Sequence, residues 1–204
     1  MRKQGLQETA ERTRRILLRR EADYSMDTEL LQQLPTIDPD KYPQNVVIAN
    51  AELRRIAAAE SGLRALASVV GAATVTREVD NQQAVAAVAL ARHKPEDAIA
   101  ELEGCRPYDS ASLEGASMRA RAYLAAGKPE LAETEFKKVI DHQFVSPVTQ
   151  SIPLAHLGRA RALEMEGNHA AARREYETLF ELWKDADADL PPLRQARQEY
   201  AKLH

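Results

Sequence analysis

The sequence predicts an all-α fold in which antiparallel helix hairpins stack into a solenoid closed by a C-terminal capping helix. Three observations support this prediction: abundant Ala, Leu, Glu and Arg, apolar residues at helical spacing, and self-similarity from about residue 80 onward. Aromatic residues make up only 5% of the 204 residues, which leaves little of the flat side-chain surface that sheets pack with. With 44% hydrophobic and 29% charged residues, the composition is typical of a folded domain.

Residues 1–43 are expected to form an N-terminal helical segment followed by a proline-rich linker. An amphipathic pattern over about Lys3–Arg20 predicts a surface helix, and about Asp27–Leu34 is expected to form a short one. Three prolines then follow before residue 44, and each biases the residue before it away from the helical region. The proline-rich stretch therefore reads as a linker or loop.

Residues 44–79 are expected to form a helical pair, a possible degenerate repeat. Asn45 is a suitable N-cap for a helix over Asn45–Glu60, Ser61-Gly62 punctuates it, and a second helix is expected over Leu63–Val79. The apolar run Leu66–Val75 is too short to cross a membrane, so a buried helix is expected there. In the repeat interpretation, the unit runs from Leu53 through Gly62 to Ala65 and Val69.

Residues 80–204 are expected to contain three helix hairpins and a cap, because three segments repeat one pattern of small and large residues. Corresponding positions lie 34 and 40 residues apart, and the surplus falls in the loop-like stretch Asp141–Pro153. A small residue on each of two antiparallel helices lets their axes approach, while a large residue fills the wider gap beyond. The pattern consists of Ala86, Ala120 and Ala160, then Ala98, Ala132 and Ala172, then Leu102, Phe136 and Tyr176.

The segment Pro191–Tyr200 is expected to be the capping helix. Proline suits a first helical turn, and Leu193, Ala196 and Tyr200 share one stripe. Each hairpin has an apolar face that it cannot cover alone, so an array of this kind needs a last helix to cover the final face.

Residues 80–183 resemble tetratricopeptide repeats, whose pattern has an early small residue and aromatic, then Ala-x3-Phe, then Pro. Ala132-x3-Phe136 and Ala172-x3-Tyr176 match this pattern, whereas the opening Trp is absent, and Arg119 and Arg159 stand where Leu is usual. The resemblance implies a helical repeat whose concave surface binds other proteins.

The tail, residues 181–203, is similar to the C-terminal end of repeat regions attached to large bacterial serine/threonine kinases and winged-helix regulators. The chain has no Gly-rich phosphate loop, His-Arg-Asp loop or Asp-Phe-Gly motif, so this resemblance implies a repeat module without kinase activity. It also adds an alternative function, a detached sensor or regulatory domain. Such a domain would face the periplasm if the chain were a piece of a membrane-bound kinase.

Charge and reactive residues argue against several classes of function. The formal net charge of −3 leaves no basic excess for nucleic acid or an anionic membrane, and the absence of an apolar leader favours a cytoplasmic location.

Cys105 is the only cysteine, so it forms no internal disulfide; it is expected to be a small buried residue in the second helix of its hairpin. His142 and His156 flank the long loop, where a metal site is the alternative to ordinary surface or capping histidines. We expect no enzyme activity, no catalytic residues, no cofactor and no metal.

The first helices of successive hairpins are expected to line a concave surface that binds a peptide or a partner helix. Arg121 and Arg161 occupy equivalent positions there and are suited to hold carboxylates of an acidic partner; pairing with a neighbouring Glu, or simple solvation, is the alternative. A homodimer through the N-terminal helix is a further alternative. The predicted surface comprises Gln83, Ala87, Leu90, Glu114, Ser117, Arg121, Leu124, Leu157, Arg161 and Glu164.

Overall fold

A computed structural model describes residues 43–67, 79, 81–145 and 151–203. Within these ranges the chain forms helices and no strand, which confirms the all-α prediction. The expected helices over Lys3–Arg20 and Asp27–Leu34 and the proline-rich linker lie outside the described residues. The α-helices are α3 (Pro43–Glu52), α4 (Ile56–Ala67), α5 (Asn81–Ala91), α6 (Pro95–Glu103), α7 (Glu114–Ala125), α8 (Pro129–Asp141), α9 (Ser151–Met165), α10 (His169–Leu182) and α11 (Pro191–Tyr200).

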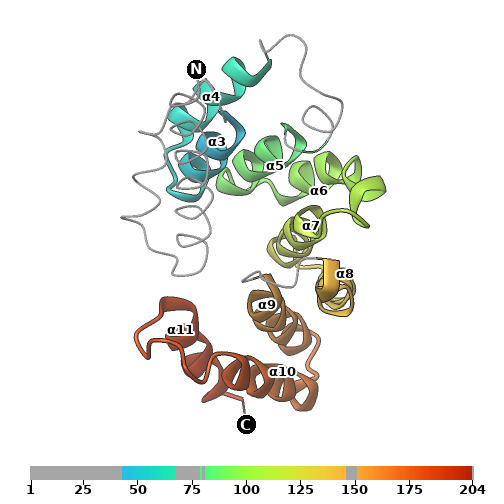
Figure 1. Ribbon diagram of the computed structural model, residues 1–204, viewed down its shortest axis with the longest axis vertical. Helices are drawn as coiled ribbons and strands as arrows, with labels where there is room; N and C mark the ends of the chain where they lie inside the picture. Colours follow the sequence, from blue (N-terminus) through green and yellow to red (C-terminus); the bar gives the residue numbers. More distant parts are fainter. Residues whose placement is uncertain (1–42, 68–78, 80, 146–150, 204) are drawn as a thin grey trace, which may run out of the picture.

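The helices pack as successive antiparallel pairs, α3/α4, α5/α6, α7/α8 and α9/α10, which follow one another along the long axis of the molecule (Figure 1). Each helix contacts the next one in the chain. The first helices of the pairs also contact one another directly, α3 with α5, α5 with α7 and α7 with α9. The described part of the chain is therefore a helical, repeat-like array in which the first helices form one continuous layer.

The same turn joins the two helices of all four pairs. In each turn one residue has a positive φ, and the N–H of the next residue donates to the carbonyl five residues earlier, as in a Schellman C-cap. The positive φ angles are 58° at Arg54, 58° at His93, 69° at Gly127 and 78° at Gly167. The bonds that close the turns run from Arg55 to Asn50, Lys94 to Ala89, Lys128 to Tyr123 and Asn168 to Leu163, at 2.8–2.9 Å.

The first pair corrects the prediction for residues 44–79. The expected helix over Asn45–Glu60 ends at Glu52, and Ser61-Gly62 lies inside α4 instead of breaking a helix. Gly62 allows the two helices to approach closely, because a Cβ built there would come 2.6 Å from a methyl carbon of Val47. The turn was missed because Arg54 adopts the left-handed conformation that sequence reasoning reserves for Gly or Asn. Most of the expected second half, residues 68–78, lies outside the described residues.

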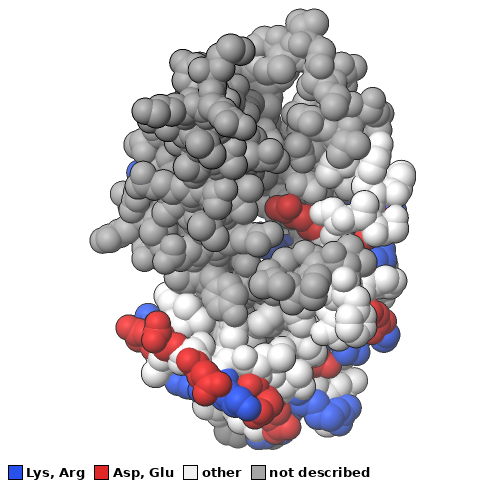
Figure 2. Space-filling view, in the orientation of Figure 1, with Lys and Arg blue, Asp and Glu red and all other residues white. Residues whose placement is uncertain are grey.

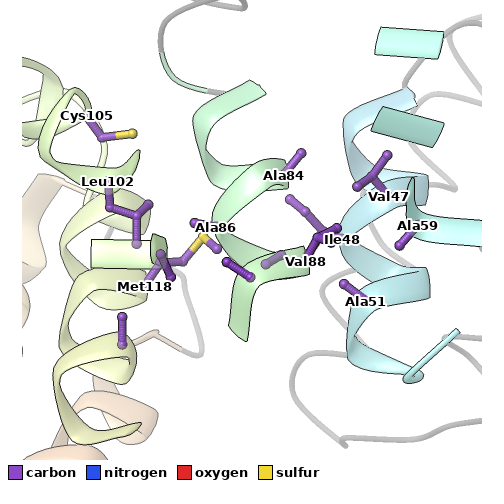
Figure 3. Close-up of a cluster of buried hydrophobic side chains, with 14 of the residues drawn as sticks. Val47, Ile48, Ala51, Ala59, Ala84, Ala86, Val88, Leu102, Cys105 and Met118 are labelled. Carbon is purple, nitrogen blue, oxygen red and sulfur yellow. The ribbon is translucent and has the colours of Figure 1, made fainter. Parts of the chain in front are cut away.

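The small residues of the pattern lie at the helix contacts, as predicted. Ala86, Ala98, Ala120, Ala132, Ala160 and Ala172 are all fully buried. The large residues fill the space beyond them: the Phe136 ring lies so close to Gly158 of α9 that a Cβ there would overlap it. At the N-terminal end, side chains from α3, α5, α6 and α7 interdigitate in one cluster that includes Ile48, Val88, Leu102 and Met118 (Figure 3).

The capping helix α11 covers the last pair, as predicted. Leu193 and Ala196 are buried, and the Tyr200 ring packs edge-on against Tyr176 and Phe180, at centroid distances of 6.1 and 5.4 Å. The Arg173 guanidinium lies over the Tyr200 ring, 4.7 Å from its centroid. This aromatic cluster joins α11 to α10.

Two boundaries differ from the prediction. Ser151–Pro153, expected to end a loop, forms the first turn of α9, where a proline does no harm because its missing N–H would have no helical partner. Cys105 is buried as expected, but it follows α6 instead of lying within it, and its Sγ lies 3.4 Å from Gln82 Oε1. No helix in the described part of the chain combines the length and the apolar character needed to cross a bilayer.

Candidate functional site

The predicted binding surface divides into buried and accessible residues. Gln83, Ala87 and Leu157 are buried, with Gln83 only 4% and Leu157 only 3% exposed, so the expectation that their side chains face a groove is wrong. Ala87 belongs to the cluster with side chains of α3, α6 and α7, and Leu157 to the cluster with side chains of α10 and α11, so neighbouring helices cover these positions. The accessible residues are Glu114 and Arg121, which are exposed, and Leu90, Ser117, Leu124, Arg161 and Glu164, which are partly buried.

Two of the accessible residues, Leu90 and Arg121, line an open pocket of about 260 Å³ at the C-terminal ends of α3, α5 and α7. Arg54 and His93 contribute the other polar groups, and Pro95 and Ala125 complete the apolar wall. The pocket thus combines two guanidinium groups and an imidazole with a small apolar surface.

Two of the three polar side chains of the pocket, Arg54 and His93, come from the turns that follow α3 and α5, and the third comes from α7. Arg54 Nη1 donates to the carbonyl of Ala91 at 2.7 Å and lies 3.4 Å from His93 Nε2. Arg121 projects from α7 with 56% of its side chain exposed, and its Nη1 lies 4.0 Å from Glu52 Oε1. An ion pair at that distance and exposure contributes little, so the Arg121 guanidinium can exchange it for another carboxylate.

Sequence reasoning missed Arg54 and His93 as site residues. They hold the turn position with positive φ that Gly127 and Gly167 hold in the later pairs, and both side chains line the pocket. The alignment of the repeats could have revealed them, because it places a residue other than glycine at the turn position where glycine is usual. For Arg54 the alignment could not be made, because the turn between α3 and α4 was not recognised from the sequence.

Arg161, the equivalent of Arg121 one pair later, already binds a carboxylate of the same chain. Its Nε and Nη2 donate to the two carboxylate oxygens of Glu199 on α11, both at 3.0 Å, and the Tyr176 hydroxyl donates to the same carboxylate at 3.0 Å. Burial and then the charge of Glu199 raise the pKa of the Tyr176 hydroxyl above its usual value. For Arg161 the expected alternative, pairing with a Glu of the same chain, is therefore the outcome. Acidic and basic side chains adjoin across this end of the molecule (Figure 2).

Arg119 is the largest fully buried side chain among the described residues. Its guanidinium donates to Asp109, to Glu135 at 3.0 Å and to the carbonyl of Leu102 at 3.2 Å. Burial raises the pKa of the Glu135 carboxyl, but Arg119, Arg106 and Lys138 outweigh burial and leave it below its usual value. The buried charge is compensated, so this cluster holds α7 and α8 to the preceding pair.

The next pair repeats the same ion pair at the same spacing of 16 residues. Arg159 Nη1 contacts Glu175 at 2.7 Å, its Nη2 contacts Glu133 at 2.7 Å, and His156 Nδ1 lies 2.7 Å from Glu175. Arg119 and Arg159 therefore each pair with a glutamate on the following helix.

The two histidines considered for a metal site have other contacts. His142 Nδ1 lies 2.9 Å from the carbonyl of Lys138 at the end of α8, whereas His156 contacts Glu175. Across the described ranges, no three side chains of the metal-binding types come together. Neither histidine belongs to the pocket.

The chain matches no protein-family model, no curated protein and no solved structure in comparisons with each of them. The tetratricopeptide and kinase-tail resemblances therefore stay predictions that rest on residue patterns.

Proposed function

We propose that the protein is a non-catalytic interaction module that binds an acidic segment of a partner protein on the layer of first helices. The observation that carries this proposal is the open pocket where Arg54, His93 and Arg121 surround a small apolar surface. A guanidinium fork donates two parallel hydrogen bonds to a carboxylate, and the apolar wall suits the methylene groups of an acidic side chain.

The architecture supports the proposal, because a layer of parallel first helices offers a long surface to an extended peptide or a helix. The resemblance to tetratricopeptide repeats implies the same kind of role. Net charge argues against nucleic acid and membranes as partners, and in this proposal the module acts in the cytoplasm.

Charge reversal in the pocket tests the proposal. Proteins captured from a cell lysate are identified by mass spectrometry for three immobilised chains: wild type, the double variant Arg54→Glu with Arg121→Glu, and Arg174→Glu as the control. Arg174 is exposed on α10, away from the pocket. Partners should be retained by wild type and by the control and lost from the double variant. Identical captured sets from all three chains would refute the proposal.

Arg161 is not suited to this test, although it is equivalent to Arg121. Its reversal would also break the contact with Glu199 and disturb α11. Restricting the substitutions to Arg54 and Arg121 separates partner binding from loss of the cap.

A second candidate function, a detached sensor or regulatory repeat domain of a bacterial serine/threonine kinase or transcription regulator, is favoured by the tail. That tail includes α11 and the buried Trp183. The coding sequences that neighbour the gene test this candidate. A kinase or winged-helix domain encoded nearby would support it, and unrelated neighbours would count against it.

A further inference from the structure

Of two arginines at equivalent positions, one has a carboxylate partner close enough for direct hydrogen bonds. Arg161 on α9 has such a partner in Glu199 and is 33% exposed, whereas Arg121 on α7 is 56% exposed and has Glu52 at 4.0 Å. One of the two equivalent arginines is therefore held by a carboxylate of the same chain, and the other lines the open pocket.

The contact between Arg161 and Glu199 shows which kind of segment can bind an arginine at this position. The carboxylate comes from a helix, α11, which lies outside the four pairs and is anchored by Leu193 and Ala196. Glu199 follows Ala196 by three residues, so the small residue and the carboxylate share one helical face. The helix places its backbone close to the array through alanine and reaches the arginine with glutamate.

The pocket at Arg121 has further hydrogen-bonding groups of its own. Phe136 stands where Tyr176 stands in the next pair, so no hydroxyl is available, but Arg54 and His93 supply hydrogen-bonding groups on the other side of the pocket. Leu90, Pro95 and Ala125 leave a pocket of about 260 Å³, which suits a carboxylate with its methylene stem and one small neighbour.

From this comparison we infer that the partner segment is an amphipathic helix that presents a glutamate, one turn after a small residue, to Arg121 as α11 presents Glu199 to Arg161. This inference rests on the proposed function and names the partner class: an acidic helix of another protein. Two guanidinium groups against a single carboxylate provide the charge complementarity.

The probe is a fluorescent synthetic peptide of residues 189–203 of this chain, stapled between Arg194 and Gln198. These two positions are four residues apart and exposed, so the staple holds the helix without touching its buried face. Its binding to the full chain is followed by fluorescence anisotropy. A matched probe carries Glu199→Gln, which keeps the shape and removes the charge.

Saturable binding to wild type is expected, with affinity about tenfold weaker or worse for Arg121→Leu and for the matched probe, because charge-assisted hydrogen bonds are lost in both. Glu52→Gln should strengthen binding, since it removes the weak competitor. Because the Arg121 side chain is largely exposed, its substitution should leave the helical content unchanged, which circular dichroism checks.

Three outcomes overturn the inference. Absence of saturable binding shows that a helix of this kind does not fit. Binding that survives Arg121→Leu but is lost in Arg161→Leu shows that the probe merely replaces the chain's own α11. A dimer of the intact chain that Arg121→Leu dissociates identifies a second copy as the occupant.

The two tests separate the two proposals. Capture of partners that depends on Arg54 and Arg121, without binding of the probe, refutes the inference and leaves the proposed function standing. Binding of the probe through Arg121, with lysate capture indifferent to the pocket, refutes the proposed function instead.

Discussion

Replacing Arg119 by Leu should destabilise the fold far more than replacing its equivalent, Arg159. The Arg119 side chain is fully buried, and its loss leaves Glu135, whose side chain is 5% exposed, with reduced compensation. Removing one partner of a buried ion pair costs about 3–5 kcal/mol. Since Arg106 and Lys138 still contact Glu135, we expect the lower end, about 3 kcal/mol. For a protein of this size that lowers the unfolding midpoint by roughly 6–12 °C.

Arg159→Leu is the matched control, because it makes the same change at the same repeat position. The Arg159 side chain is 23% exposed, and water can reach the carboxylates that it leaves behind. Its loss should cost about 1 kcal/mol, a shift of roughly 2–4 °C. Thermal and urea unfolding followed by far-ultraviolet circular dichroism measure both variants.

Equal losses in the two variants, or a cost below about 1 kcal/mol for Arg119→Leu, would refute the reasoning that burial decides the effect. The double variant Arg119→Leu with Glu135→Leu supplies a second check. It removes the uncompensated carboxylate and should recover stability relative to the single variant, because apolar residues often replace a buried pair at little cost.

Two further predictions follow from the same contacts. The folded-state pKa of Glu135 is lowered, so its contribution to stability is present above its unfolded pKa and is lost as pH falls through the folded pKa. Urea unfolding at falling pH should show this loss, and Glu135→Gln should make the curve shallower; an unchanged curve would contradict it. Gly158→Ala should cost about 1–3 kcal/mol in urea unfolding, because the new Cβ overlaps the Phe136 ring, and the cost should shrink in a Phe136→Leu background; a wild-type midpoint would show that the ring can move aside.

Local and periodic features were predictable from the sequence. The alanine and aromatic pattern located three of the helix pairs, and the prolines with the Leu193, Ala196 and Tyr200 stripe located the cap. These features depend on residues within one or two helical turns and on side-chain size, both of which a sequence displays directly.

The candidate site was only partly predictable. Leu90 and Arg121 were named from their register, but Gln83 and Leu157 are buried, and Leu157 packs with side chains of α10 and the capping helix α11. Arg54 and His93 entered the site through a left-handed backbone conformation that their residue types do not announce.

From α5 onward, the sequence by itself therefore determined the helices, their pairing and the small residues at their crossings, since these follow from short-range periodicity and sterics. Only the tertiary structure decided which of two equivalent arginines is open: Arg161 is filled by a glutamate 38 residues away on α11, and Arg121 is not. The reason is physical, because charge pairing depends on distance in space, and that distance is set by how the pairs stack and where the capping helix lies.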